Sequence, residues 1–313
     1  MVWTWDYGQG DSSPSPAAAG ENHGTAVAGV VAGRANLIGV RGSAPLGGLI
    51  AQRWGPGTSE DADAILDASA HGADVHSNSW SYQDLILPDV VANAIRTVTA
   101  NGMLVVFAVG NEYGSIADNS LLAAMPETLA VGASTDADAH ATYSNTGPEL
   151  DLVAPSNGGL TAVWTTDVRD GLFSTDGYAV GDYFNNFGGT SSATPLVAGV
   201  AALCRAVDPA LTATQLRAVL EHTCDQIGSS YDGTTSHSDT FGYGRLNAAV
   251  GVQAANAGQT WPDHVSNLSS SYSGSNPVLN WDNPPDDVST VMIVRSLAVF
   301  DFKPTDGTNY SVG

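Results

Sequence analysis

Residues 103–112 read MLVVFAVGNE, an apolar run that ends in Gly-Asn. A continuous apolar run of this kind is typical of a strand that is buried on both faces of a parallel sheet. Ligands of open α/β sheets bind at the carboxyl ends of the strands, so the side chain of Asn111 is expected to face a crevice. The stretch therefore predicts a parallel sheet with a binding site at its carboxyl edge. Taken alone, Asn111 is better explained as a turn former.

Short apolar runs alternate with helical patterns on both sides of this stretch, from about residue 20 to residue 256. This alternation is typical of a parallel sheet covered by helices on both faces, and it predicts a doubly wound α/β domain. The predicted strands are 49–53, 73–77, 103–108, 128–131 and 151–153, and the predicted helices are 60–70, 88–100, 192–206 and 212–222.

The pattern changes after residues 258–264, which we interpret as a linker. VLNW at 278–281 and TVMIVR at 290–295 are β-rich runs separated by the turn formers DNPPDD. The tail resembles the opening strands of a fibronectin type III domain. Residues 265–313 are too few for a whole domain of that type, so we expect an all-β partial module.

The 313 residues include 10 Lys plus Arg and 32 Asp plus Glu, which gives a net charge of −22. This balance argues against nonspecific binding to nucleic acid or anionic membranes, because both depend on basic residues. The sequence contains no run of 18 apolar residues, so it predicts no membrane span. An acidic surface suits a medium with salt or calcium, and solubility alone is the alternative explanation. The two cysteines cannot form a disulfide framework.

Two further motifs are suited to nucleophilic chemistry. HGTAVAG at 23–29 places His23 at the start of a helix of small residues, where it can be held as a general base must be held. GTSSATP at 189–195 uses a glycine turn to present Ser191 at a helix start, where free N–H groups and the helix dipole favour an oxyanion. Each motif alone also fits a structural role, an ordinary histidine or an N-capped helix.

Together, HGTAVAG, AVGN and GTSSATPLVAG resemble the histidine, oxyanion and serine motifs of the subtilisin-like serine proteases, the subtilases or peptidase family S8. The motifs stand in the family's order and extend over nearly all of residues 1–256. The resemblance implies a serine endopeptidase with His23 as general base, Ser191 as nucleophile and Asn111 as oxyanion donor. It also implies that the substrate adds as a strand between two segments, Ser79, Trp80 and Ser81 and Ala108, Val109 and Gly110.

The resemblance further implies a secreted, monomeric peptidase domain over residues 1–257. It implies peptide or protein substrates and no cofactor for the chemistry. A binding or adhesion protein on a protease-like fold, with the tail as its contact module, is the alternative function. The presence of His23, Asn111 and Ser191 together favours hydrolysis.

The third triad member has no clear counterpart. In the family, an aspartate precedes the histidine and ends an apolar strand in a D-S/T-G context. Only Asp6 and Asp11 precede His23, and we expect residues 1–22 to form a polar, proline-broken loop in which neither aspartate follows an apolar strand. We therefore expect the domain to lack its N-terminal strand and the triad aspartate to lie upstream of Met1 in a longer chain.

Several details resemble the kexin or proprotein-convertase branch, among them TWDYGQGD, the Ser79-Trp80 pair and TTD at 165–167. That branch cuts after basic residues, and Asp84 is a candidate for an acidic group in its specificity pocket. The chain reads SWSYQD where the branch has S-W-G-P, so we do not expect strict basic specificity.

Calcium is the other expectation for this region. Asp84 and Asp118 are candidate ligands, and Asn36 lies in RANLIG, 34–39, where subtilases often carry a calcium loop. Ca²⁺ takes six to eight oxygen ligands, of which the sequence supplies some. A solvated surface position is the alternative for each of the three residues.

Overall fold

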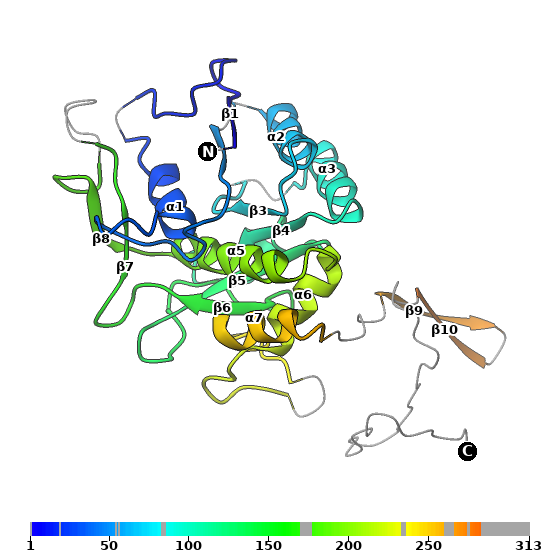
Figure 1. The fold of residues 1–313 in the computed structure, drawn as a ribbon. Coiled ribbons are helices and arrows are strands. Elements are labelled where there is room, and N and C mark those ends of the chain that lie inside the picture. Colours follow the sequence, from blue (N-terminus) through cyan, green and yellow to red (C-terminus); the bar gives the residue numbers. More distant parts are fainter. Residues whose placement is uncertain are drawn as a thin grey trace.

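A four-stranded parallel sheet forms the centre of the molecule (Figure 1). The computed structural model describes residues 2–18, 20–53, 55, 57–82, 86–169, 177–232, 236–259, 266–273 and 276–282. The strands lie in chain order, with β5 paired to both β4 and β6. They are β3 (Val75–Asn78), β4 (Leu104–Ala108), β5 (Thr128–Ser134) and β6 (Leu152–Pro155). Each of these four strands overlaps a strand predicted from the sequence, so the prediction of the central parallel sheet is confirmed.

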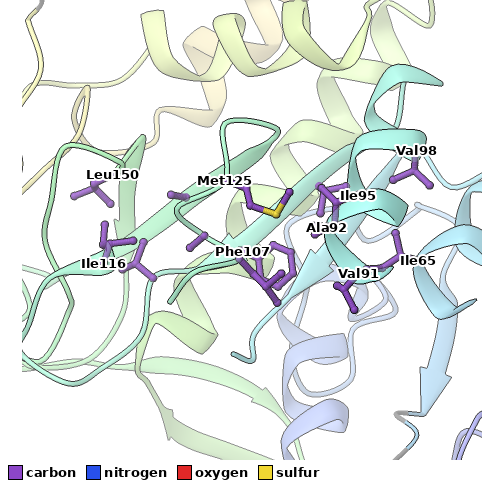
Figure 2. Packing of buried hydrophobic residues seen from close by; sticks show 14 of the residues in the cluster. Ile65, Val91, Ala92, Ile95, Val98, Phe107, Ile116, Met125 and Leu150 are labelled. Atoms are coloured by element: carbon purple, nitrogen blue, oxygen red, sulfur yellow. The ribbon is translucent and has the colours of Figure 1, made fainter. Parts of the chain in front are cut away.

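Helices cover both faces of this sheet. Along β4, Val105 and Phe107 belong to a core with α2 (Thr58–Ala70) and α3 (Asp89–Ala100), shown in Figure 2. The alternate residues Leu104 and Val106 belong to a second core, formed with α5 (Thr190–Val207), α6 (Ala213–His222) and α7 (Ala248–Asn256). Because successive side chains of a strand point to opposite faces, β4 is apolar throughout. The doubly wound prediction is confirmed.

A second, two-stranded sheet consists of β1 (Trp3–Asp6) and β2 (Ile50–Arg53), which pair in parallel. It is not hydrogen-bonded to the sheet of β3–β6. The expectation of a loop throughout residues 1–22 is therefore wrong, because aromatic and β-branched residues form a strand before the Gly- and Pro-rich segment begins. The expectation that neither early aspartate follows an apolar strand is wrong for Asp6, because Asp6 ends β1 after Trp3, Thr4 and Trp5.

The remaining elements extend the domain on either side. α1 (His23–Ala32) packs against α5 and against β7 (Val163–Thr166), which pairs with β8 (Tyr183–Phe187). The short α4 (Ile116–Asn119) follows β4. The hairpin β7–β8 and the helix α7 were not predicted from the sequence.

The described part of the tail is an antiparallel pair, β9 (Ser266–Ser273) and β10 (Asn276–Asp282). VLNW lies in β10 as predicted, and the run at 290–295 lies outside the described residues. The fibronectin-like module therefore stays a prediction.

Helix α5 is the one described helix long and apolar enough to cross a membrane. It packs against β3, β4, β5 and β6, and 61% of its apolar window is buried, as expected for the central helix of a folded core. Its Cys204 is buried. Cys204 and Cys224, which follows α6, are both free thiols.

Candidate active site

Close packing between α1 and its neighbours explains the small residues around His23. A Cβ added to Gly29 would lie 2.3 Å from the Thr166 side-chain oxygen, so only glycine fits between α1 and β7. Thr166 Oγ1 donates to Thr25 O at 2.8 Å, which fixes the first turn of the helix against that strand. The HGTAVAG motif thus holds His23, the first residue of α1, in a defined position.

The nucleophile candidate lies at the start of α5. Gly189, immediately before the helix, has φ 73°, a conformation that glycine adopts without strain. Ser191 Oγ lies 3.5 Å from Ser79 O, and Ser79 Oγ donates to Ser191 O at 3.0 Å. The structure therefore brings Ser79, from the segment after β3, directly against Ser191.

Asn111 is oriented by Thr190, the residue before the nucleophile candidate Ser191. Its Oδ1 accepts hydrogen bonds from Thr190 N at 2.8 Å and Thr190 Oγ1 at 3.2 Å. Because a backbone N–H only donates, the amide oxygen must face Thr190 and Nδ2 must face away from it. Asn111 is exposed, so this N–H₂ group is available to an oxygen bound beside Ser191.

His23 is half-buried, and its ring meets the edge of Phe187 at a centroid distance of 5.7 Å. Burial lowers the pKa of its imidazole below the usual value of 6.5, which keeps the ring neutral and able to accept a proton at pH 7. Phe187 is four residues before Ser191, so the contact brings the base candidate to the same end of α5. Among the described residues, no carboxylate hydrogen-bonds to His23, and no bond joins it to Ser191.

Asp6 is fully buried but engaged elsewhere. Its carboxylate accepts from Gly8 N and Gln9 N and forms a salt bridge with Arg53 at 3.0 Å. Arg53 also pairs with Glu21 at 2.8 Å, two residues before His23. Asp6 thus helps to hold the segment that leads to His23 and does not contact the imidazole itself.

The two predicted substrate-binding segments lie at the carboxyl ends of adjacent parallel strands. Ser79, Trp80 and Ser81 follow β3, and Val109 and Gly110 follow Ala108 at the end of β4. The Trp80 ring meets Phe107 edge-on at 5.5 Å, and its Nε1 donates to Asn78 Oδ1 at 3.0 Å. This tryptophan is therefore an anchor that packs on the core.

The candidate calcium ligands do not form a cluster. Asp84 lies outside the described residues. Asn36 and Asp118 are exposed, and Asn36 Oδ1 accepts from Ile38 N at 3.1 Å within its own loop. Across the described ranges, no three His, Cys, Asp or Glu side chains come together as metal ligands. The side-chain oxygen of Asn36 is of the type that Ca²⁺ prefers.

Two groups of site residues were not predicted from the sequence. Tyr143 donates to Ser156 Oγ at 2.8 Å, and Ser156 Oγ lies 2.7 Å from the side chain of Ser192, which follows the nucleophile candidate. Ser156 also donates to Gly189 O at 2.8 Å, so this network supports both sides of Ser191. No motif marks these positions, because the network joins segments that are distant in the sequence.

The second group is a single side chain, Asn145, which is fully buried. Its Oδ1 accepts from Glu112 N at 3.1 Å and Gly114 N at 2.9 Å, and its Nδ2 donates to Val109 O at 2.8 Å and to the Glu112 carboxylate at 2.6 Å. It therefore holds the backbone on both sides of Asn111.

Asn145→Asp is expected to lower the free energy of unfolding by about 3 kcal/mol. The variant keeps the acceptor oxygen but loses the donor to Val109 O, and it places a second carboxylate against Glu112. Urea unfolding at pH 7 measures the change. Asn93→Asp on the exposed face of α3 is the matched control, with an effect within about 0.5 kcal/mol. Equal losses in the two variants would contradict the role given to Asn145.

Comparison with known proteins identifies the arrangement. The model of the subtilase family, Peptidase_S8, matches residues 1–244. A calcium-dependent protease of Nostoc sp. is 35% identical over 276 residues, covering 77% of this chain and 41% of the relative. A halolysin-like extracellular serine protease, Nep, of Natrialba magadii is 33% identical, covering 79% and 42%. A subtilisin of Bacillus pumilus is 31% identical, covering 77% and 81%.

A solved structure agrees with these matches. A protease from Pseudoalteromonas arctica superposes with a TM-score of 0.67 at 28% identity, covering 81% of this chain and 84% of that one. The chain spans about two fifths of the length of the Nostoc and Natrialba relatives.

Proposed function

Because the chain belongs to the subtilase family, we propose that it carries the nucleophile, base and oxyanion donor of a serine endopeptidase. The observation that carries the proposal is the placement of Asn111, whose amide is fixed by Thr190 beside Ser191 with Nδ2 directed away from Thr190. In a catalytic asparagine this orientation is required, whereas a turn former has no need of it.

In the proposed mechanism, Ser191 Oγ attacks the peptide carbonyl carbon and His23 takes the serine proton. The negative charge moves to the carbonyl oxygen, which accepts hydrogen bonds from Asn111 Nδ2 and from the Ser191 N–H at the start of α5. The imidazolium then protonates the leaving amine, and an ester to Ser191 remains. Water, deprotonated by His23, hydrolyses this ester and frees Ser191.

The triad carboxylate belongs, in this proposal, to a strand that the 313 residues do not contain. Two observations support it. Among the described residues no carboxylate bonds to His23, and the carboxylate of Asp6 is taken by Arg53 and two backbone N–H groups. The parent protease is proposed to be extracellular, since the strongly acidic composition suits such a medium and the Natrialba relative is named as extracellular. Its substrates are peptides or proteins.

Covalent labelling tests the proposal. A fluorophosphonate probe reacts with activated serines, and we expect peptide mass spectrometry to find the adduct on Ser191. Ser191→Ala should abolish the adduct, His23→Ala should slow its formation, and Ser12→Ala at an exposed position should leave it unchanged. A folded chain in which Ser191 stays unlabelled would instead favour the alternative, a binding protein on a protease-like fold.

Calcium is proposed as a weak structural ligand of the Asn36 loop, an idea supported by the name of the Nostoc relative. Neutral oxygens without a clustered carboxylate suggest a dissociation constant of about 1 mM. At 10 mM Ca²⁺, this affinity stabilises the fold by about 1.4 kcal/mol, and we expect EDTA to lower Tm by about 3 °C. Asn36→Ala should remove the difference. An unchanged Tm in the unmodified chain would refute this calcium site.

A further inference from the structure

A pocket of about 380 Å³ lies beside the hairpin of β7 and β8, which packs on α1 (Figure 1). It is lined by the loop 157–162, by Trp164 of β7 and by Asn185 and Asn186 of β8. Sites for small molecules usually occupy about 300–1,000 Å³, so the volume is sufficient for a ligand. None of the lining residues is charged, although the chain contains 32 Asp plus Glu, so the pocket is suited to a neutral ligand.

Asp136 holds one side of the pocket in place. Its carboxylate accepts hydrogen bonds from Leu160 N at 3.1 Å, from Thr161 N at 2.9 Å and from Thr161 Oγ1 at 2.8 Å. A Cβ added to Gly159 would overlap Asp136 Oδ1, so the loop can approach Asp136 this closely only with glycine there. The hydrogen bond from the Thr161 side chain lowers the pKa of the Asp136 carboxyl, so this group stays charged and keeps the loop fixed at neutral pH.

Asn157 fixes the other side of the pocket. Its Oδ1 accepts from Gly189 N at 3.2 Å, and its backbone carbonyl accepts from the Tyr143 hydroxyl at 3.1 Å. A Cβ added to Gly188 would overlap the Asn157 side chain, so these two residues are in close contact. Both sides of the pocket are therefore held by hydrogen bonds, and a ligand would enter a site that is already formed.

Three side chains of the hairpin are available to a ligand. Trp164 is 61% exposed, and Asn185 and Asn186 are exposed as well. Among the residues that the structure describes, the Trp164 indole N–H and the two side-chain amides have no hydrogen-bond partner. Each amide offers donors and an acceptor, which is what a hydroxyl group needs, since a hydroxyl also donates and accepts. The large ring of Trp164 adds an apolar surface beside these amides.

A pyranose sugar has the matching chemistry, because it combines an apolar face of C–H groups with a rim of hydroxyl groups. An extended peptide fits less well, because its main chain needs free backbone partners. The N–H groups of Leu160 and Thr161 are bound to Asp136, and that of Gly189 is bound to Asn157. A negatively charged sugar would be repelled by Asp136 behind the loop.

We propose that the pocket beside β7 and β8 binds a neutral pyranose sugar, with one sugar ring packed on Trp164 and its hydroxyl groups hydrogen-bonded to Asn185 and Asn186. The pocket uses none of the proposed catalytic residues, so sugar binding does not depend on the proposed function. It gives the chain a carbohydrate site that is separate from the segments proposed to bind peptides.

The experiment uses the full 313-residue chain and two neutral disaccharides, cellobiose and chitobiose. Binding is followed by NMR through the indole N–H resonance of Trp164, which is assigned by its absence from the spectrum of Trp164→Ala. The indole N–H of Trp80, which is bonded to Asn78, is the internal control. Three compounds serve as ligand controls. Sorbitol has hydroxyl groups but no ring face, glucuronate carries a negative charge, and acetyl-trialanine amide represents a peptide.

We expect at least one of the two disaccharides to shift the Trp164 resonance saturably, and the Trp80 resonance to stay in place. The three control compounds should cause no saturable shift. In the variants, binding is followed at the side-chain amide of Asn185. Trp164→Ala should weaken it at least about tenfold, as expected for the loss of an aromatic anchor. Asn186→Ala, which leaves the tryptophan in place, should weaken it at least about threefold.

Tyr113→Ala is the matched control, because it removes a similarly exposed aromatic ring outside the pocket. It should change the affinity by less than about twofold. The inference would be overturned by the absence of a saturable shift with either disaccharide, by an equal shift with sorbitol, or by unchanged affinity in Trp164→Ala and Asn186→Ala. A shift with the peptide and with neither sugar would overturn it in favour of a peptide site.

Discussion

The chain by itself is expected to hydrolyse unfolded casein about 3 × 10⁴-fold more slowly than a complete subtilisin. That factor is the loss in kcat measured for subtilisin when its aspartate alone is removed. It corresponds to about 6 kcal/mol of transition-state stabilisation, at 1.36 kcal/mol per factor of ten. The physical reason is that His23 has no described carboxylate to fix its tautomer and stabilise the imidazolium formed during attack.

The remaining activity should still depend on the serine. In subtilisin, loss of the nucleophile costs about 2 × 10⁶, so Ser191→Ala should lower the residual rate by a further factor of about 70. The measurement is the initial rate with fluorescent casein, taken on the unmodified chain and on Ser191→Ala at the same protein concentration. A rate within tenfold of the complete enzyme would refute the absence of the carboxylate. A residual rate that is the same in Ser191→Ala would show that it does not come from this site.

The second large effect is expected for Arg217→Met, which should lower the free energy of unfolding by about 3–5 kcal/mol. Arg217 lies on α6 and contacts two carboxylates, Glu221 at 2.7 Å and Asp151 at 2.5 Å. Their side chains are 3% and 6% exposed. Without the guanidinium, two neighbouring negative charges remain buried. Asp151 Oδ2 also accepts a hydrogen bond from Ala130 N in β5. A displaced Asp151 would therefore also disturb the central sheet.

Arg96→Met is the matched control for this prediction. Arg96 makes a similar contact with Glu127 at 3.1 Å, but its side chain is 51% exposed. Surface ion pairs contribute about 0–1 kcal/mol, so a small change is expected. Urea unfolding of both variants at pH 7 gives the comparison. Equal losses in the free energy of unfolding for the two variants would contradict the prediction, because the Arg217 cluster would then stabilise the fold no more than an exposed ion pair does.

The sheet and its helices were predictable because burial on both faces makes each strand a continuous apolar run. The residues of β4 show why this works, since alternate side chains enter two different cores. β1 was missed because its four residues precede a Gly- and Pro-rich segment that masks them. The hairpin β7–β8 was missed because its residues are only partly buried and carry no strong alternation.

The site was predictable to the extent that its residues lie in short motifs. His23, Asn111 and Ser191 each lie in a motif that contains a glycine required by the structure. Gly29 packs against Thr166, and Gly110 and Gly189 have φ angles of 96° and 73°. Asn145 and the network of Tyr143, Ser156 and Ser192 had no such signal, because their roles depend on contacts between distant segments.

The most direct test of the central claim, that His23 is the base for Ser191, is the pH dependence of Ser191 labelling by a fluorophosphonate. Burial lowers the pKa of His23, so the neutral, proton-accepting form should already predominate at pH 6.5. We predict that the labelling rate rises with pH through a midpoint below 6.5 and then levels off, and that this rise is absent in His23→Ala. The same pH profile in both proteins would contradict the account.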